Sequence, residues 1–232
     1  MKKPVSRVTG AALEAIAQRV DGRAARWTEH RKARREELID AALDAVKEFG
    51  SDVGMDQIAA AAHTSKPVIY RYFAHKGDLY RAVGERVIAQ VVTALRGVPV
   101  DSDPQALLRA SIDAYLQLVE QNPKLFRFVT ELHAGNGDFS RPVVDVLSAA
   151  LGEQLRSIGL DPTGAEPWGE AAVGFIRSAS LWWLDHPGTM TRVQLREYLA
   201  ALLWGGGAGV FQFAGREVEA RPHPDVFAKL ER

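Results

Sequence analysis

The 232-residue chain carries 29 basic and 29 acidic side chains, 47% hydrophobic residues and no cysteine. This size and apolar content can bury a core and argue against wholesale disorder, while the lack of cysteine excludes disulfides, thiol nucleophiles and Cys-ligated metal centres. Residues 1–27 lack the apolar stretch of a signal peptide, and the longest apolar run, 199–214, is too short to span a bilayer, so we expect a cytoplasmic protein.

The balanced net charge is unevenly distributed along the chain. Residues 1–96 hold 17 basic and 12 acidic side chains, whereas the remaining 136 residues hold 12 basic and 17 acidic ones. The first 35 residues alone hold 10 basic and 3 acidic side chains. A basic amino-terminal region joined to an acidic remainder is typical of a polyanion-binding head, although helical proteins also carry such charges as a solvated surface.

Helical periodicity dominates the sequence, and no stretch alternates like a strand. Residues 10–20 predict a short amphipathic helix, which a basic linker follows. Residues 28–49 predict a longer helix that ends at Gly50 and buries Leu38, Ile39, Ala42, Leu43, Val46 and Phe49. Further helices are expected at 55–62, 65–73, 76–96, 103–120, 123–133, 141–158, 165–185 and 190–214. The sequence therefore predicts an all-α fold.

Residues 54–73 form two short helical segments separated by a tight turn at His63-Thr64, the pattern of a helix-turn-helix motif. The hydroxyl of Ser65 is placed to cap the second helix, and Pro67 stands where a missing N–H costs nothing. Ile69 and Phe73 lie four residues apart and are expected on the buried side. The outward side is then formed by Lys66, Pro67, Val68, Arg71 and Tyr72, with Tyr70 at its border.

An exposed helix of this composition suits the major groove of DNA. An arginine can bridge the two acceptors of guanine, and valine methyl groups can pack against a thymine methyl. Tyrosine hydroxyls, the Ser65 region and Lys76 at the head of the next helix can meet phosphates. The alternative is that the Tyr-Arg-Tyr-Phe cluster at 70–73 is a packed corner between helices, which for Phe73 is the favoured interpretation.

Three segments resemble the TetR family of transcriptional regulators: IAAAA at 58–62, SKPVIYRYF at 65–73 and HKGDLYRAV at 75–83, preceded by a helix ending in Phe49-Gly50. The resemblance is close over residues 31–91. It implies a homodimeric DNA-binding protein, usually a repressor, whose carboxy-terminal helical domain binds a small molecule and releases the operator. The implied organisation is a basic extension at 1–27, a DNA-binding domain at 31–91 and an effector-binding and dimerisation domain at 100–232.

Matched by position, the resemblance implies roles for individual residues. The residues implied to contact bases are Lys66, Pro67, Val68 and Arg71. The residues implied to bind phosphates are Gly54, Ser65, Tyr70, Tyr72, Lys76, Arg31 and Arg34. Gly54 stands where the family usually has a capping Ser or Thr, so its phosphate contact would reduce to a backbone N–H. His63 stands in the turn where Gly is usual, and His tolerates the left-handed conformation less well.

The amino-terminal extension is longer than the family needs. Its basic side chains could form an arm that follows the phosphate backbone or enters a minor groove, and they are Arg23, Arg26, Arg31, Lys32, Arg34 and Arg35. A solvated basic tail is the alternative.

Small residues recur along the last two predicted helices, Ala171, Gly174 and Ser178 in one and Ala201, Gly205 and Gly209 in the other. Because a glycine inside a helix costs about 1 kcal/mol relative to alanine, close packing against another helix must compensate for the run at 205–207. The resemblance places the two-fold interface on these helices, as a four-helix bundle. A glycine contact within one chain is the alternative.

The resemblance also implies a cavity in the carboxy-terminal domain. Candidate lining residues are Tyr115, Phe126, Phe128, Trp168, Phe175, Arg177 and Trp182, although each aromatic could simply belong to the core. Few charges occur at the inward positions of 105–133, which favours a small hydrophobic effector, first a fatty acyl chain or acyl thioester and second a planar cation. Asp113, Glu131, His133 or Arg177 could supply a polar contact.

Two other functions, an enzyme and a ligand carrier, are alternatives to DNA reading. Enzymatic activity is disfavoured because the sequence has no nucleophile elbow, no HExxH motif and no phosphate loop, and its histidines are scattered, so no catalytic residue, metal or cofactor is expected. A helical carrier that binds a ligand but not DNA would leave Lys66, Arg71 and Lys76 unexplained. A transcriptional activator of the same fold remains an alternative to a repressor.

Overall fold

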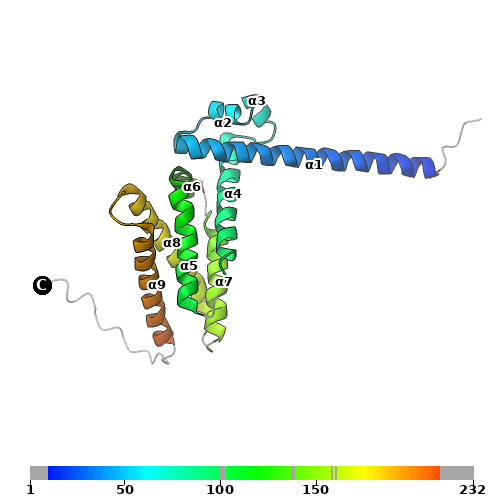
Figure 1. Cartoon of the computed structure of the whole chain (residues 1–232). Coiled ribbons are helices and arrows are strands. Elements are labelled where there is room, and N and C mark those ends of the chain that lie inside the picture. The colour runs from blue at the N-terminus through cyan, green and yellow to red at the C-terminus, as the bar shows by residue number, and fades with distance from the viewer. Residues whose placement is uncertain (1–9, 100–102, 137–138, 158, 160, 215–232) are drawn as a thin grey trace, which may run out of the picture. The chain divides into compact units, whose positions relative to one another are not determined.

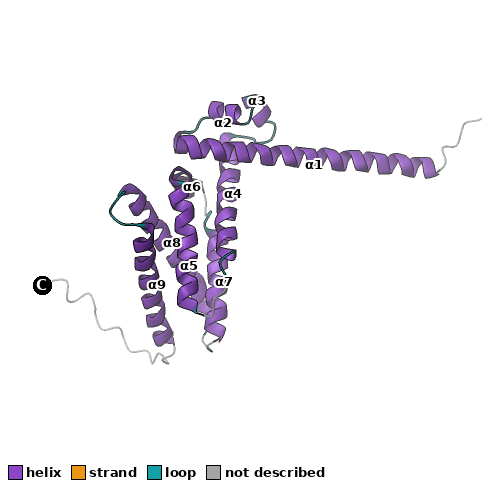
Figure 2. Cartoon of the chain, in the orientation of Figure 1, coloured by secondary structure: helices purple, strands orange, loops and turns teal. Residues whose placement is uncertain are grey.

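The structure, a computed structural model, describes residues 10–99, 103–136, 139–157, 159 and 161–214, with side chains described from Trp27 onward except at 134–136 and 207–214. Within these residues the secondary structure is helical throughout, without a strand, as the sequence predicts (Figures 1 and 2). The chain divides into two units, Met1–Val83 and Gly84–Arg232. The boundary between the units falls inside helix α4 (Lys76–Arg96).

The first unit begins with one continuous helix, α1 (Gly10–Phe49), which extends well past its two short neighbours in Figure 1. The prediction of two helices joined by a basic linker is therefore wrong. The segment at 21–27 has no proline, and its arginines and alanines are good helix formers, so continuing the helix costs less than breaking it. The helix ends where Gly50 takes a positive φ of 72°.

After α1 the chain forms a 3-10 turn, η1 (Gly50–Asp52), followed by α2 (Met55–Ala61) and α3 (Lys66–Ile69). The core of this unit holds both short helices against α1, and its members are Leu38, Ile39, Ala42, Leu43, Val46, Val53, Ile58, Ile69, Phe73, Leu79 and Val83. Phe49, predicted to point inward, is instead 40% exposed because it is the last residue before the chain turns at Gly50.

Helix α3 is shorter than predicted. It forms one turn, and the residues that follow continue as tight turns, with the Arg71 N–H donating to the Val68 carbonyl at 3.2 Å and the Tyr72 N–H to the Ile69 carbonyl at 2.9 Å. These i→i+3 bonds tighten the end of a helix without extending it. Residues 70–73 are therefore held mainly by the packing of Ile69 and Phe73.

The second unit contains α5 (Pro104–Gln121), α6 (Pro123–Asn136), α7 (Arg141–Ser157), η2 (Pro162–Gly164), α8 (Ala165–Asp185) and α9 (Arg192–Ala214), close to the predicted bounds. Helix α7 packs on α8, and α5 packs on α9. Ile112, Leu116 and Val119 of α5 pack with Trp183, Leu195, Leu199 and Ala200 in one apolar cluster.

Candidate nucleic-acid interface and effector region

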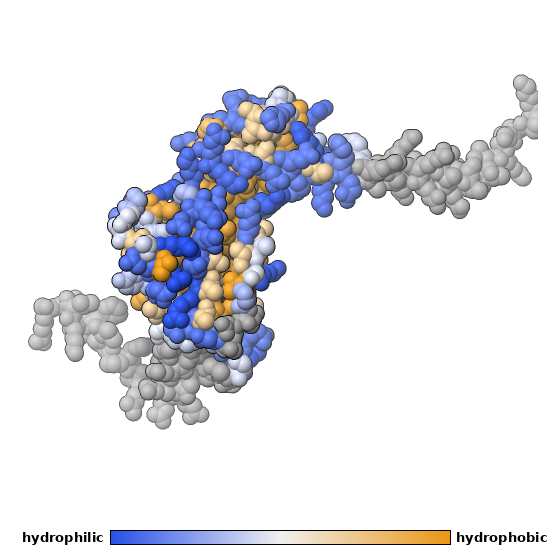
Figure 3. Space-filling view, viewed as in Figure 1, coloured by the Kyte–Doolittle hydropathy of each residue, from blue (hydrophilic) through white to orange (hydrophobic). Residues whose placement is uncertain are grey.

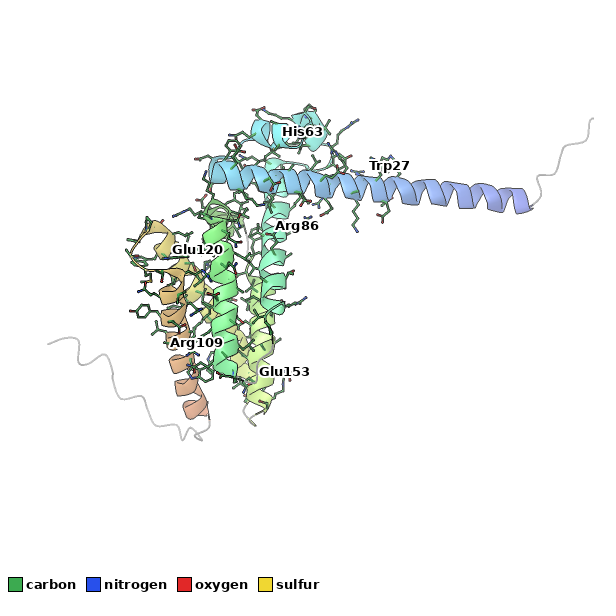
Figure 4. All side chains as sticks on the ribbon, viewed as in Figure 1. Trp27, His63, Arg86, Arg109, Glu120 and Glu153 are labelled. Carbon is green, nitrogen blue, oxygen red and sulfur yellow. The ribbon has the colours of Figure 1, made fainter. Side chains whose placement is uncertain are left out.

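The turn between α2 and α3 depends on His63, which has a φ of 47° and is the one described residue other than glycine with a positive φ. The His63 N–H donates to the Ala60 carbonyl at 3.0 Å, and the Thr64 N–H donates to the Ala59 carbonyl at 2.9 Å. This pair of bonds is the Schellman motif that ends a helix and reverses the chain. His63 thus takes the left-handed conformation expected of a turn glycine, and it is labelled in Figure 4.

The outward side of α3 carries the residues that the sequence placed there. Lys66, Pro67 and Arg71 are exposed and Tyr70 is 45% exposed, whereas Val68 and Tyr72 are half-buried. Phe73 is 3% exposed and belongs to the core. The packed-corner interpretation is therefore right for Phe73, does not hold for the exposed Tyr70, and holds in part for Tyr72, which is half-buried.

Lys66 has a partner that the sequence analysis missed. Its Nζ lies 2.8 Å from Oδ2 of Asp56, in the first turn of α2, so an ion pair joins the start of α2 to the start of α3. An acidic residue in a first helical turn complements the helix dipole, which is the only sequence signal that singled out Asp56. Any base contact by Lys66 must compete with this carboxylate.

The residues that precede α2 and α3, Gly54 and Ser65, each differ from expectation in their hydrogen bonding. The Gly54 N–H donates to Oε1 of Gln57 at 2.5 Å, so it is already used within the chain and is not the free phosphate donor that the sequence suggested. Ser65 precedes α3 in an extended conformation, but its side chain makes no capping hydrogen bond. Ser65 is exposed, so its hydroxyl remains able to bind a phosphate, whereas the Gly54 N–H does not.

The start of α4 lies beside the same surface. Lys76 is exposed, with its Nζ 4.7 Å from the ring centre of Tyr80. The Tyr80 hydroxyl donates to the Val53 carbonyl, which ties α4 to the segment preceding α2. The ammonium group of Lys76 therefore lies over the Tyr80 ring, and the hydrogen bond to Val53 fixes the position of that ring.

Among the basic residues of the extension, two contact the segment after α3. Nη2 of Arg31 donates to the Arg71 carbonyl at 3.4 Å, and the guanidinium of Arg35 lies 4.9 Å from the ring centre of Phe73. Arg34 instead pairs with Glu37 at 2.6 Å, and Lys32 is exposed. The side chains of Arg23 and Arg26 lie outside the described residues.

In the second unit, part of the predicted effector site comes together. Tyr115 of α5 and Phe126 of α6 meet edge to face with ring centres 6.0 Å apart. Burial raises the pKa of the Tyr115 hydroxyl well above its ordinary value, opposed by a hydrogen bond with Ser180 and by the charge of Arg177. Ser180, which is fully buried on α8, was not predicted, and its only sequence signal is a hydroxyl within an apolar helix.

The other predicted lining residues are not gathered there. Phe128 is 2% exposed and is a core residue, and Trp168 is half-buried. Phe175 and Trp182 are 38% and 44% exposed on α8, and Trp182 stacks on His186. The hydrophobicity of an aromatic residue does not say which side of a helix it occupies, which explains why these two were misplaced.

A hollow of about 600 Å³ lies elsewhere, along the end of α4, α5 and α9. Alanines form much of its wall, and Arg109, Asp113, Gln117 and Arg196 supply its polar lining. None of the seven predicted pocket residues lines it, although Asp113 was considered as a polar contact. Arg109 of α5, labelled in Figure 4, also pairs with Glu197 of α9 at 3.2 Å.

The small residues of α8 and α9 lie on the surface. Ala171, Ser178, Ala201 and Gly205 are exposed, and a Cβ added at Gly174 or Gly205 would meet no atom within 4 Å. A glycine contact within the chain is thus excluded at those two positions, while the surroundings of Gly209 lie outside the described residues. Tyr198 and Leu202, 64% and 62% exposed, lie on α9 beside Gly205 and were not predicted.

Hydrophobic residues reach the surface in patches over the second unit, whereas hydrophilic residues cover most of the first unit on the face shown in Figure 3. In the described part of the chain no helix is long and apolar enough to cross a membrane. The same residues hold no group of histidine, aspartate and glutamate side chains that could bind a metal ion.

Two family models match the chain. The model described as bacterial regulatory proteins of the tetR family matches residues 38–83, and the model described as the tetracyclin repressor-like C-terminal domain matches residues 91–217. The first match contains α2 and α3, and the second contains α5 to α9.

The chain is also similar to individual transcriptional regulators. An HTH-type transcriptional regulator of Mycobacterium tuberculosis H37Rv, Rv0472c, is 32% identical over 224 residues, covering 91% of this chain and 94% of the relative. The transcriptional activator FasR of Mycolicibacterium smegmatis is 27% identical over 76% of this chain and 84% of its own length. FadR of Bacillus subtilis, solved in complex with stearoyl-CoA, shares the fold with a TM-score of 0.61 and 20% identity over 74% of this chain and 98% of that one.

Proposed function

The chain belongs to the TetR family of DNA-binding transcriptional regulators, and from this premise we propose that it is a dimeric repressor that a hydrophobic effector releases from a palindromic operator. Residues 31–91 bind DNA in this proposal, and residues 100–232 bind the effector and form the dimer. The single observation that carries it is the exposed surface of α3 and the turn after it, where Lys66 and Pro67 of the helix and Arg71 of the turn are exposed.

Each residue of this surface has a distinct task. Arg71 and Lys66 read base edges, with Val68 and Pro67 supplying apolar contact in the groove. Ser65, Tyr70, Tyr72 and Lys76 bind phosphates on either side and set the orientation of α3. Because Lys66 is paired with Asp56 at 2.8 Å, Arg71 is the stronger candidate for base discrimination.

Dimerisation is proposed through the outward faces of α8 and α9. On α8 the small residues Ala171 and Ser178 share one face with Phe175 and Trp182, and on α9 Gly205 shares one face with Tyr198 and Leu202. Helix α9 also buries Leu195 and Leu199 toward α5, so it has apolar side chains on two sides. A helix that is apolar on both sides is normally covered on both, and a second copy of the chain would supply the missing cover.

The effector is proposed to be a fatty acyl chain or acyl thioester bound next to Tyr115. Phe126 provides an apolar neighbour, while the Tyr115 and Ser180 hydroxyls and Arg177 provide polar groups for a carbonyl or thioester. Support comes from FadR, a protein of the same fold that binds stearoyl-CoA. Because FasR is an activator, activation instead of repression remains the second candidate, and the position of the operator relative to the promoter would decide between them.

The proposal is tested by selecting bound fragments from random duplex DNA with the full-length chain. We expect a palindrome whose half-sites lie about one or two helical turns apart, as two-fold related heads require. Adding a long-chain acyl thioester should release the selected DNA, and a short-chain thioester serves as the matched control. A carrier that does not read DNA would enrich no sequence, and that outcome would reject the proposal.

A further inference from the structure

Three residues of α1 stand four apart on one ridge of the helix, Trp27, Arg31 and Arg35. The guanidinium of Arg31 lies 5.7 Å from the ring centre of Trp27 and also donates to the Arg71 carbonyl at 3.4 Å. The guanidinium of Arg35 lies 4.9 Å from the ring centre of Phe73. The ridge therefore touches the first and last residues of the segment 71–73, directly after α3.

We propose that this ridge braces the reading segment and sets the position of Arg71, so that Arg31 and Arg35 determine sequence preference without contacting bases or phosphates. The inference rests on the proposed reading role of Arg71. It assigns Arg31 a positioning role in place of the phosphate contact that the sequence suggested.

The segment depends on turn hydrogen bonds and on the packing of Phe73, and not on a regular helix. Helix α3 is one turn long; residues 71 and 72 follow it through i→i+3 hydrogen bonds, and the Phe73 N–H donates to the Ile69 carbonyl at 3.1 Å. A single helical turn has no stability of its own, so the direction of Arg71 depends on what fixes the residues around it. Phe73 is buried on one side by the core and covered on the other by the planar guanidinium of Arg35.

The Arg31 contact fixes the backbone at the reading residue itself. A hydrogen bond to the Arg71 carbonyl limits rotation of that peptide plane, and the exposed Trp27 ring contacts the same Arg31 guanidinium. These three residues precede residue 38, where the match to the family model begins. The long α1 thus supplies part of the reading apparatus from outside the matched stretch.

Arg34 offers a matched control within the same helix. It carries the same charge and lies between the two bracing arginines in sequence, but it pairs with Glu37 at 2.6 Å. A change at Arg34 removes a positive charge near the interface without removing the brace.

The experiment compares Arg35→Lys, Arg31→Lys, Trp27→Ala and Arg34→Ala for binding to the selected operator and to random duplex DNA, each over a range of salt. The first two variants keep the charge but lose the planar guanidinium. We expect operator affinity to fall about tenfold in these two and several-fold in Trp27→Ala, with affinity for random DNA and the salt slope unchanged. Arg34→Ala removes a charge to which the resemblance gives a phosphate contact, so it should weaken binding to both DNAs equally and keep the full preference for the operator.

An equal loss on both DNAs, with the salt slope reduced by about one, would identify Arg31 and Arg35 as phosphate contacts and overturn the brace. Unchanged operator preference in all three brace variants would also overturn it. Trp27→Ala guards against misfolding as an explanation, because Trp27 is 66% exposed and outside the core. The wild-type chain separates the two hypotheses. If it shows no preference for any operator, the proposed function fails and the brace fails with it, whereas a wild-type preference that all three brace variants keep rejects the brace alone.

Discussion

At the scale of single residues, His63 shows how the chain meets a backbone requirement with an unusual side chain. The Schellman turn after α2 needs a residue with positive φ, and His63 provides it at 47°. A left-handed conformation strains any residue with a Cβ, and histidine tolerates it only somewhat better than branched residues do. The turn that sets α3 across α2 therefore carries a small energetic cost in this chain.

This cost leads to a prediction for His63→Gly. Removing the Cβ relieves the strain, and after the entropy that glycine adds to the unfolded chain we expect a net stabilisation of about 0.5–1 kcal/mol. The urea midpoint of the full-length chain measures it. His63→Ala is the control, because alanine removes the exposed imidazole but keeps the Cβ. Equal midpoints for the glycine and alanine variants would contradict the strain argument.

At the scale of elements, the contact between α7 and α8 depends on one glycine. A Cβ at Gly169 would clash with Oγ of Ser148 and would lie 3.3 Å from its backbone nitrogen. The Ser148 Oγ is buried without a hydrogen-bond partner, so the hydroxyl contributes packing at the cost of desolvation. The two helices approach this closely because position 169 has no side chain.

Gly169→Ala is accordingly expected to destabilise the chain by about 1–3 kcal/mol, the usual cost of overpacking. The double variant with Ser148→Ala should recover part of this loss, since it removes the clashing Oγ but leaves the backbone nitrogen at 3.3 Å. Gly164→Ala, where an added Cβ meets no atom within 4 Å, is the matched control. Thermal unfolding followed by circular dichroism gives the comparison, and a Gly169→Ala midpoint equal to that of the control would refute the packing argument.

The element scale also shows what the sequence could and could not predict. The bounds of α5 to α9 followed from local signals such as Pro104, Pro123 and Gly188, which act through backbone geometry within a few residues. The break expected at 21–27 was wrong because a run of charge does not interrupt a helix when proline is absent. The pairing of Lys66 with Asp56 and the contact of Arg35 with Phe73 join different elements, and no local pattern encodes them.

The same limit explains the effector region. All four candidates were predicted from their aromatic character alone. Tyr115 and Phe126 lie against the core of the second unit, whereas Phe175 and Trp182 lie on an exposed side. Periodicity in α8 and α9 cannot separate these cases, because apolar residues occur on more than one side of each helix. Whether such a side faces a cavity, a core or a second copy is decided by packing between elements.

At the scale of the whole molecule, two-fold pairing would join two basic heads through apolar faces on two acidic bodies. The exposed side of α9 has large residues at Tyr198 and Leu202 and an empty position at Gly205. When large side chains alternate with glycine on one face, the large side chains of one helix can pack over the glycine of an identical partner helix, and the two helices can approach closely. The spacing of the heads, and hence of the operator half-sites, would follow from this approach.

Gly205→Leu tests this arrangement without threatening the fold, because an added side chain points into open space in the single chain. A leucine there should hold the partner helices apart and weaken the dimer about tenfold or more, since overpacking of a close interface costs roughly 1–3 kcal/mol. Light scattering at low micromolar concentration should then detect the 25.4 kDa monomer, whereas the proposed wild-type dimer should give twice that mass. Val193→Leu, on another side of α9 and already 49% exposed, should leave the mass unchanged. An unaltered dimer in Gly205→Leu would place the two-fold contact on a different surface, and the palindrome spacing would then have to be explained from there.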